Sequence, residues 1–281
     1  MILVTGSGLL GTEVIRVLSQ ELEVVGTYNS KPKAGAVCLD ITDRSKVFDV
    51  VGKTMPFAIV HTAALTNVDY CEDHREEAMS INALGTKNVA DAAKKYSAKM
   101  IYVSTDFVFD GKSGMYHEDD PVNPISYYAY TKLLGEYYVL GLDHYVIART
   151  SVVYGNARQN FVTWVRDSLK SGTRIKVVDD QFNTPTLSVD CAEAIRELIN
   201  NNARGIYHAA GAERLSRYDF ARQIAAFYGL DENLIEPVSS VTLNQRAKRP
   251  MDSSLDTTKI NEFHTMLDIR QGLSKMDTSG D

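Results

Sequence analysis

Short apolar segments alternate with longer amphipathic segments through the first half of the chain. The apolar segments are rich in β-branched residues and contain few polar ones, which is typical of parallel strands covered by helices on both faces. After the first of them, Leu10, Val14 and Leu18 recur at the spacing of an amphipathic helix. The strands predicted in this way are residues 2–5, 24–28, 58–62, 100–104 and 145–149.

The pattern is less regular after about residue 150. Alternating strands and helices favour a parallel sheet built from βαβ units. We therefore predict an α/β protein with a Rossmann-type, doubly wound parallel sheet: residues 1–150 form the dinucleotide-binding domain, and residues 151–281 form mainly a smaller substrate-binding lobe that is interleaved with it. The later elements predicted are helices at 161–169, 189–199 and 218–228, strands at 174–178 and 205–209, and a frayed polar end at 275–281.

The composition is that of an ordinary globular protein and excludes several function classes. The 281 residues are 44% hydrophobic, and 30 Lys and Arg against 36 Asp and Glu give a net charge of −6. Nucleic-acid binding is disfavoured because no global positive field is present. No apolar run approaches the roughly 20 residues of a membrane span. Met1 leads directly into the first predicted strand, so we expect a cytoplasmic protein without a signal peptide or membrane contact.

Metal binding and disulfide bonding are disfavoured as well. The three cysteines are far apart, as expected of reduced thiols. Cys71 and His74 are close enough in sequence to share a helix face, but two ligands without a second pair are too few for a structural metal site. We therefore expect no bound metal.

A glycine-rich turn joins the first predicted strand to the first predicted helix. Gly6, Gly8 and Gly11 follow the spacing G-x-G-x-x-G, in which glycines allow a tight turn, close approach of a pyrophosphate and close helix packing. The pattern predicts a dinucleotide site whose lining includes Leu9 and Leu10. The alternative is an ordinary turn before a helix, because this spacing also arises by chance.

The end of the second predicted strand favours NADP(H) over NAD(H). NAD-binding proteins usually carry an acidic residue there, which accepts a hydrogen bond from the adenosine ribose. Here no acid lies between Glu23 and Asp40. Asn29, Ser30 and Lys31 instead offer donors and a positive charge for a 2′-phosphate. The alternative is that Lys31 is a solvated loop residue.

Asp40 and Ile41 follow a third short apolar run, at residues 37–39. A strand at this run would bring the Asp40 carboxylate to the amino group of an adenine, and we assign both residues to the cofactor site. The alternative is that Asp40 and Thr42 form an N-cap before a helix that starts near Asp43.

A candidate proton donor lies in the middle of the chain. Ser104 and Thr105 end the fourth predicted strand, where parallel sheets bind ligands. Tyr128 lies four residues before Lys132, so that a helix places the phenol and the ammonium on one face. A cation about 4 Å away contributes roughly 4 kcal/mol at an effective dielectric near 20, which would lower the pKa of the phenol by about three units.

These groups suit the reduction of a ketone by hydride, which needs a proton at the carbonyl oxygen. Tyr128 would supply the proton, while Ser104 or Thr105 would orient the carbonyl by a hydrogen bond. We expect Ser104, Tyr128 and Lys132 to face the cofactor as well. The alternative is an ordinary helical surface pair, because a tyrosine four residues before a lysine is common.

Longer motifs accompany these residues and cover nearly the whole chain. They are His61-Thr-Ala-Ala-Leu-Thr-Asn-Val-Asp69, Val103-Ser-Thr-Asp-Phe-Val-Phe-Asp-Gly111, Tyr116-His-Glu118, Tyr128-Ala-Tyr-Thr-Lys-Leu133, Arg149-Thr-Ser-Val-Val-Tyr-Gly155, Gln181-Phe-Asn-Thr-Pro-Thr186 and Arg249-Pro-Met-Asp-Ser-Ser-Leu-Asp256. With the glycine loop, they resemble the extended short-chain dehydrogenase/reductase superfamily and, within it, the dTDP-4-dehydrorhamnose reductase family.

The resemblance implies a reductase that acts on the 4-keto group of a nucleotide-linked 6-deoxy sugar, and with the cofactor preference inferred above we expect the reaction to depend on NADPH. It matches Thr105, Tyr128 and Lys132 to the catalytic positions. It also implies that Ala63, Ala64 and Asn82 line the cofactor site and that Thr66, Val68 and Phe107 border the sugar. The family usually carries Trp where this chain has Val152, and this departure removes a large flat wall from the sugar pocket.

Anion-binding groups are expected in the second half, because a nucleotide diphosphate carries about two negative charges. Asn160 opens a predicted helix, and Arg249 belongs to a basic cluster at 246–249. Gln181 opens a loop that Pro185 fixes. We assign Asn160, Gln181 and Arg249 to the substrate. The alternatives are an N-cap asparagine, an ordinary turn and a solvated charge run.

Two other functions stay open at this point. A non-catalytic regulatory subunit resembling the β subunit of methionine adenosyltransferase would keep this fold and these motifs. A nucleotide-sugar epimerase or dehydratase would retain its cofactor through the cycle. A homodimer is compatible with the sequence, which fixes neither the sugar and base nor a magnesium requirement.

Overall fold

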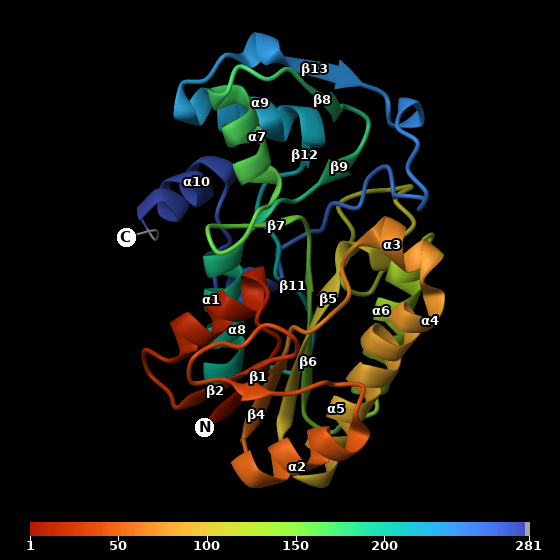
Figure 1. Ribbon diagram of the computed structural model, residues 1–281, viewed down its shortest axis with the longest axis vertical. Helices are drawn as coiled ribbons and strands as arrows, with labels where there is room; N and C mark the ends of the chain where they lie inside the picture. The colour runs from red at the N-terminus through yellow and green to blue at the C-terminus, as the bar shows by residue number, and fades with distance from the viewer. Residues whose placement is uncertain (279–281) are drawn as a thin grey trace.

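A parallel sheet of seven strands forms the centre of the protein in the computed structural model, which describes residues 1–278 (Figure 1). The strand order is β11-β6-β5-β4-β1-β2-β3. The strands are β1 (Ile2–Thr5), β2 (Val24–Tyr28), β3 (Val37–Cys38), β4 (Ala58–His61), β5 (Lys99–Thr105), β6 (Tyr145–Thr150) and β11 (Gly205–His208). The order reverses between β1 and β4, and open parallel sheets bind ligands at such a switch point. The predicted α/β class and Rossmann-type sheet are confirmed.

Helices cover both faces of this sheet because its strands are apolar on both sides. Successive side chains of β1 point to opposite faces: Ile2 and Val4 pack into one core, and Leu3 packs into the other. The first core includes α1 (Leu9–Leu18) and α8 (Ser188–Asn200), and the second includes α2 (Arg44–Thr54), α5 (Thr86–Lys95) and the end of α6 (Tyr127–Leu140). Figure 1 shows these two helical layers on either side of the sheet.

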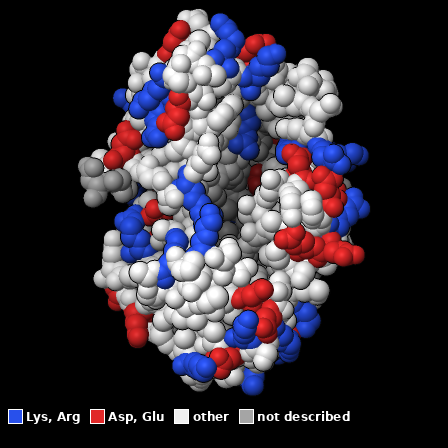
Figure 2. Space-filling view, in the orientation of Figure 1, with Lys and Arg blue, Asp and Glu red and all other residues white. Residues whose placement is uncertain are grey.

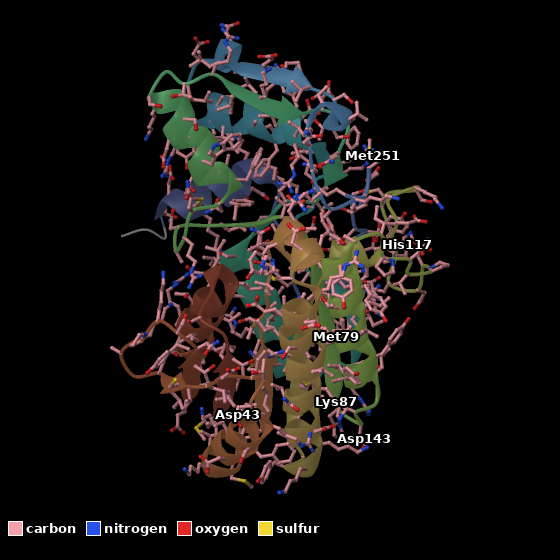
Figure 3. All side chains as sticks on the ribbon, turned by 45° about the vertical axis from the view of Figure 1, so that its right-hand side comes forward. Asp43, Met79, Lys87, His117, Asp143 and Met251 are labelled. Atoms are coloured by element: carbon pink, nitrogen blue, oxygen red, sulfur yellow. The ribbon has the colours of Figure 1, made fainter. Side chains whose placement is uncertain are left out.

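A chain of short helices leads from β4 to α5. It consists of α3 (Val68–Asp73), α4 (Arg75–Ala78) and the π-helix η1 (Met79–Gly85), and Figure 3 marks its Met79. π-helical turns are rare and often occur at functional sites. A 3₁₀-helix, η2 (Asp106–Val108), follows β5 directly. The 3₁₀-helix therefore lies at the carboxyl end of β5, whereas η1 packs against α6 and continues into α5.

A smaller lobe lies beyond the carboxyl edge of the sheet, at the top of Figure 1. Two parallel strands, β8 and β13, pair within it, and β9 pairs antiparallel with β12. Its helices and strands are β7 (Val153–Tyr154), α7 (Phe161–Lys170), β8 (Ile175–Val178), β9 (Phe182–Asn183), β10 (Thr186–Leu187), β12 (Leu215–Ser216), α9 (Arg217–Tyr228), η3 (Glu232–Leu234), β13 (Ile235–Val238), η4 (Ser240–Thr242) and α10 (Ile269–Thr278). The short helix η5 (Ile260–Glu262) instead lies beside β11 and α8, which its flanking residues contact. The second half of the chain also supplies α8 and β11 to the main sheet, so lobe and sheet are interleaved in sequence.

Most predicted element ends agree with the structure to within one residue, but the expected fraying of residues 275–281 is wrong where it can be checked. Helix α10 continues through Thr278, and Met276 in its last turn is buried. Residues 279–281 lie outside the described part of the chain. Within residues 1–278, no helix combines the length and apolar character that a membrane span requires.

Candidate active site

A cavity of about 850 Å³ lies between the carboxyl edge of the sheet and the smaller lobe. Figure 2 shows it as a hollow with Lys and Arg side chains along one margin. Its lining includes the predicted residues Gly6, Gly8, Leu9, Leu10, Gly11, Asn29, Ser30, Lys31, Asp40, Ile41, Ala63, Ala64, Thr66, Val68, Ser104, Thr105, Phe107, Tyr128, Lys132 and Asn160. Residues chosen from strand ends, loops and helices far apart in sequence therefore meet at one site.

At Gly6 and Gly11 the glycine loop packs too closely against the segment that follows β4 to admit a side chain. Gly6 has a positive φ of 99°, and a Cβ atom there would lie 2.7 Å from the backbone nitrogen of Ala63. Gly8 is the N-cap of α1 but offers no side chain to its free N–H groups. The N-terminus of a ten-residue helix thus points its donors into the cavity, an arrangement that suits a pyrophosphate.

At the end of the cavity lined by Asn29 and Ser30, Asp40 bonds to Thr42, but this pair is not the N-cap that the sequence left as an alternative. Asp40 lines the cavity, and its Oδ1 also accepts hydrogen bonds from Thr42 N (2.9 Å) and Thr42 Oγ1 (2.7 Å). The N-cap of α2 is Asp43, whose side chain accepts from Lys46 N. Exposed Lys31 lines the same end of the cavity.

Thr105, Tyr128 and Lys132 meet on the sheet side of the cavity, and all three are buried. Ser126 caps α6 and sets the start of the helix that carries Tyr128 and Lys132. The Lys132 ammonium donates to the Val103 carbonyl at 2.8 Å. Burial lowers the pKa of Lys132 to about 7, although the negative charge of Glu136 opposes this shift.

The expectation that Lys132 lowers the pKa of Tyr128 is wrong as a net effect. Burial raises the pKa of the phenol well above its ordinary value, and hydrogen bonding with Thr105 opposes the increase only in part. The negative charge of Asp106 adds to the increase. The cost of burying a phenolate therefore outweighs the attraction assumed from the helical spacing, and Tyr128 holds its proton at neutral pH.

A buried carboxylate that the sequence analysis did not assign joins the sheet to the lobe. Asp106 Oδ2 accepts hydrogen bonds from Ser151 Oγ (2.8 Å) and Ser253 Oγ (2.5 Å), and its Oδ1 accepts from Thr105 Oγ1 (3.1 Å). Burial raises the pKa of Asp106, and the hydrogen bonds from the two serines oppose that shift. Asp106 thus contacts the candidate catalytic threonine and the C-terminal segment at once.

Two arginines in the cavity lining were also missed. Half-buried Arg217, the first residue of α9, faces the charge of Asp106, and burial lowers its pKa to about 10. Arg158 extends from the lobe to the glycine loop, and its Nη2 atom donates to the Ser7 carbonyl at 3.1 Å. Neither belongs to a charge cluster in the sequence, so only long-range folding reveals them.

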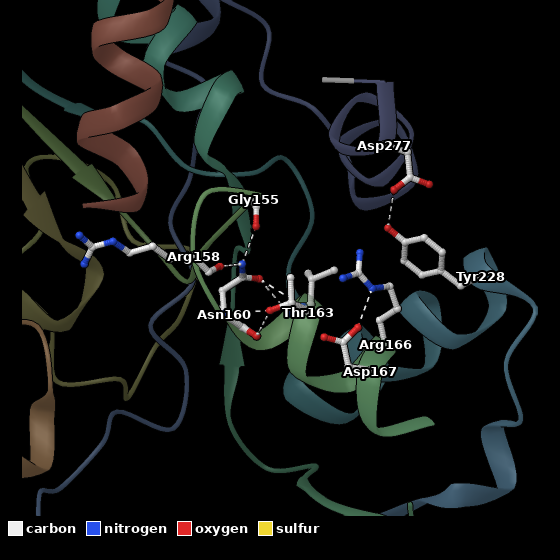
Figure 4. Close-up of polar contacts among 9 residues, drawn as sticks. Gly155, Arg158, Asn160, Thr163, Arg166, Asp167, Tyr228 and Asp277 are labelled. Carbon is white, nitrogen blue, oxygen red and sulfur yellow. Dashed lines mark hydrogen bonds and ion pairs between the residues drawn. The ribbon is translucent and has the colours of Figure 1, made fainter. Parts of the chain in front are cut away.

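Asn160 lines the cavity but acts as the N-cap of α7 (Figure 4). Its Oδ1 accepts from Val162 N (3.1 Å) and Thr163 N (3.4 Å), and its Nδ2 donates to the carbonyls of Gly155 (2.5 Å) and Arg158 (2.7 Å). Both polar atoms of this side chain are therefore engaged in the cap and in the turn before it, in agreement with the capping alternative.

Three predicted residues lie outside the cavity lining. The side chain of Asn82, in η1, accepts from Leu65 N (2.8 Å) and donates to the Leu65 carbonyl (3.0 Å), so it fixes a loop that borders the cavity. Gln181 donates to Gln245 at 3.4 Å. Arg249 forms two hydrogen bonds to the carboxylate of Asp69, at 3.0 and 2.8 Å, and is not part of the cavity lining, although its charge acts on the lining residue Arg217.

Val152 lines the cavity in a strained backbone conformation. Its φ of 43° is in the left-handed region, which a β-branched residue rarely adopts. The segment is held from the lobe by Thr186, whose N–H donates to the Val152 carbonyl (3.3 Å) and whose hydroxyl donates to the Ser151 carbonyl (2.7 Å). Such strain persists where surrounding contacts fix it, often at ligand sites.

The cysteine and histidine considered as metal ligands are used otherwise. Cys71 is buried against the Leu65 carbonyl, and burial raises the pKa of its thiol to about 11. His74 stacks on Tyr70 with ring centroids 3.7 Å apart. Away from the cavity, Asp190, Glu193 and His264 bring three ligand atoms within 4.8 Å of one another. Asp190 and His264 are hydrogen-bonded to each other at 2.7 Å, and Glu193 pairs with Lys275.

Known proteins are similar to this chain over most of its length. A family profile described as "RmlD substrate binding domain" matches residues 1–277. A dTDP-4-dehydrorhamnose reductase from Aggregatibacter actinomycetemcomitans is 34% identical over 277 residues, 93% of this chain and 92% of the relative. The methionine adenosyltransferase 2 subunit beta of Xenopus laevis is 30% identical over 273 residues, 93% of this chain and 81% of the relative.

A solved structure shares both the sheet and the lobe. The dTDP-4-dehydrorhamnose reductase from Bacillus anthracis str. Ames, in complex with NADP, superposes with a TM-score of 0.92 at 33% identity. The superposition covers 99% of this chain and 98% of that one.

Proposed function

The chain belongs to the RmlD substrate binding domain family, and on that premise we propose that it is an oxidoreductase that reduces the 4-keto group of a nucleotide-linked 6-deoxy sugar with NADPH. The reaction is of the type that converts dTDP-4-dehydrorhamnose to dTDP-rhamnose. The observation that carries this proposal is the meeting of Thr105, Tyr128 and Lys132 with a glycine-lined helix N-terminus in one cavity.

The residues of the cavity fit a dinucleotide. The free N–H groups at the start of α1 would bind the pyrophosphate, and nothing lies within 4 Å of where a Cβ of its N-cap, Gly8, would stand, so that this space is open. NADPH, when bound, supplies the hydride. We propose a preference for NADPH over NADH because Asn29, Ser30 and Lys31 line the end of β2 without an acid. The NADP complex of the Bacillus anthracis relative supports this choice.

Tyr128 would transfer the proton that the reduced carbonyl oxygen needs. Its raised pKa keeps the hydroxyl protonated at neutral pH, so the proton is available for transfer. Thr105 lies beside it and would orient the carbonyl, giving up its present bond to Asp106. Lys132, when charged, would stabilise the phenolate that the transfer leaves behind.

Arg217 and Arg158 are the groups that we assign to the diphosphate of the substrate. Both line the cavity, whereas Arg249 is bound to Asp69 and lies outside the lining. A guanidinium that faces a diphosphate forms strong, charge-assisted hydrogen bonds. Val152, with its small and fixed side chain, would border the sugar and set how large a substituent fits there.

The test is NADPH consumption with a dTDP-4-keto-6-deoxy sugar made in situ, compared with the same mixture lacking sugar. The proposal predicts sugar-dependent oxidation of NADPH and formation of the 4-hydroxy sugar. The matched trial with NADH measures the cofactor preference. A flat trace with several such sugars would refute the proposal.

A non-catalytic regulatory subunit is the second candidate. The observation in its favour is the match to a methionine adenosyltransferase β subunit along 93% of the chain. This function predicts a stable complex with a methionine adenosyltransferase catalytic subunit and no sugar-dependent oxidation of NADPH. Size-exclusion chromatography of the mixed proteins, together with the NADPH assay, separates the two functions.

A further inference from the structure

A buried aromatic ring lies directly against the ammonium of Lys132. The Nζ atom is 4.1 Å from the centroid of the Tyr102 ring, and Tyr102 is fully buried in β5. The Tyr102 hydroxyl also donates to the Lys132 backbone carbonyl at 3.2 Å. The same tyrosine therefore contacts both ends of this lysine, which connects β5 to α6 below the cavity.

Helix α6 is built to admit this ring. Gly135 lies in the helix interior, where glycine costs roughly 1 kcal/mol relative to alanine. A methyl group at position 135 would overlap the hydroxyl of Tyr102 and lie 2.8 Å from its Cζ atom. The glycine is thus explained by the close approach of Tyr102 to the helix backbone.

A neutral histidine fixes the ring from β4. The rings of His61 and Tyr102 are stacked, with centroids 5.7 Å apart and planes 21° apart. The two ring nitrogens of His61 lie 2.5 Å from Thr5 Oγ1 and 3.0 Å from Thr86 Oγ1. Burial, assisted by the charge of Lys132, lowers the pKa of His61 to about 3. His61 therefore adds no positive charge beside the ammonium at neutral pH.

The carboxylate whose charge acts on Lys132, that of Glu136, is hydrogen-bonded to other partners. Glu136, one turn along α6, accepts from Arg149 at 3.0 and 2.8 Å and from Ser104 at 2.5 Å. The close contacts of the Lys132 ammonium are the Val103 carbonyl and the face of Tyr102. The negative face of an aromatic ring attracts a cation, most strongly where both are removed from water.

We propose that Tyr102 is a positioning residue that holds the Lys132 ammonium charged beneath Tyr128. The proposal rests on the proposed function for its catalytic consequence, but the charge of Lys132 can be measured without catalysis. The ring face stabilises the ammonium form, and the hydroxyl fixes the ring against α6. Loss of the ring would favour the neutral amine, which cannot stabilise a phenolate.

Among the titratable groups around its ammonium, Lys132 is the group whose charge changes near neutral pH. They are Tyr128 and Glu136 on α6, His61 on β4 and Tyr102 on β5, and Glu136 is in turn paired with Arg149 on β6. Burial raises the pKa of both tyrosines, the pKa of His61 is about 3, and Glu136 and Arg149 form a pair. The pKa of Lys132 is about 7, so its charge changes within the working range of an activity assay.

The primary test follows the Lys132 side chain by NMR in the full chain labelled with ¹³Cε-lysine. Lys132→Met identifies the signal. The expected result is that Tyr102→Leu lowers the pKa of Lys132 by about one unit, while Tyr102→Phe, which keeps the ring, stays within a few tenths of a unit of the parent protein. An equal shift in both variants would assign the effect to the hydroxyl and overturn the proposal, as would no shift in either.

A second pair of variants covers the case in which Tyr102→Leu fails to fold. Gly135→Ala pushes the Tyr102 hydroxyl away from α6 and should lower the pKa of Lys132. Adding Tyr102→Phe removes the overlapping hydroxyl and should restore part of the loss. If Gly135→Ala folds and leaves the pKa of Lys132 unchanged, the ring does not control that charge.

The pH profile of kcat/KM then links the charge to the proposed function. Because the charged form is active, kcat/KM should fall as pH rises through the pKa of Lys132. In Tyr102→Leu this alkaline limb should move to lower pH by the shift that NMR records, and Tyr102→Phe should leave it in place. If NMR shows the shift but no variant reduces a keto sugar, the proposed function fails and the role of Tyr102 stands.

Discussion

The two walls of the cavity are built by different kinds of interaction. The sheet wall consists of strands in register and of the helices that follow them, so Thr105, Tyr128 and Lys132 occupy places that backbone pairing determines. The lobe wall consists of short strands, loops and the N-terminal ends of α7 and α9, held by side chains from distant parts of the sequence. Asp106 contacts Ser253 across 147 residues of sequence.

The two kinds of wall suit two different tasks, proton transfer and the selection of a substrate. Groups that transfer a proton need fixed geometry, which regular elements supply. The groups to which we assign substrate selection, Arg217 and Val152, lie on the irregular wall, where one residue can change without disturbing the sheet. Val152, at the edge of the lobe wall, shows how side-chain contacts there hold even a strained backbone. Substitutions on the two walls should therefore have different signatures.

The largest effect is expected on the sheet wall. Tyr128→Phe removes the proton donor and should lower kcat by about 10²- to 10⁴-fold. NADPH affinity, measured by fluorescence titration, should change little because the ring remains. Tyr130→Phe, on the same helix but 44% exposed and outside the cavity lining, is the matched control. Normal turnover by Tyr128→Phe would show that Tyr128 is not the proton donor.

A smaller and selective effect is expected on the lobe side. Arg217→Met should raise the KM for the sugar nucleotide by about 10- to 100-fold, the value of one or two charge-assisted hydrogen bonds. The KM for NADPH should stay nearly constant. Arg249→Met breaks the pair with Asp69 outside the cavity and should raise the substrate KM less. If Arg249→Met raised the substrate KM more than Arg217→Met, Arg249 would be the residue that binds the diphosphate, as the sequence predicts.

The hydrogen bond between Asp106 and Ser253 connects the two walls, and its loss should lower the free energy of unfolding. Ser253→Ala removes a hydrogen bond to the buried carboxylate of Asp106, and we expect about 2 kcal/mol less free energy of unfolding. Ser171→Ala is the control, because that exposed serine bonds only to nearby residues of the same turn. Urea denaturation monitored by circular dichroism gives both values. Equal stabilities would mean that Asp106 does not hold the lobe.

The smallest effect concerns the choice of cofactor. Lys31→Met should reduce the preference for NADPH over NADH by about fivefold to tenfold, since an exposed lysine contributes a modest contact to a phosphate. Lys33→Met is the matched control, because Lys33 donates to Thr12 at 2.8 Å and lies outside the cavity lining. Ratios of kcat/KM for the two cofactors decide the point. An unchanged ratio in Lys31→Met would show that this lysine is a solvated loop residue.

The sequence predicted the sheet wall well because its signals are local. Apolar runs set the strands, and the glycine spacing and the Tyr128 to Lys132 interval depend only on adjacent residues. The direction of the Tyr128 pKa was not predictable in this way, because the depth of burial is a property of the whole fold. Gly135 was a further local signal, although only the structure shows that Tyr102 is its cause.

The lobe wall was predicted less well because its contacts are long-range. The sequence places Arg249 in a basic cluster, but Asp69 on α3, 180 residues earlier, bonds to it outside the cavity lining. Arg217 stands in no cluster, so no pattern distinguished it from other helix-starting residues. Asn82 and Gln181 were assigned near the site and instead support the segments beside it.

The most direct test of the central claim follows the hydride itself. The protein would be incubated with NADPH carrying deuterium at the transferable position and with a dTDP-4-keto-6-deoxy sugar, and the sugar product would be examined by mass spectrometry and NMR. The account predicts a single deuterium at C4 of the product sugar, formed by the parent protein and nearly lost in Tyr128→Phe. A sugar recovered unreduced, with the deuterium still on the nicotinamide, would contradict it.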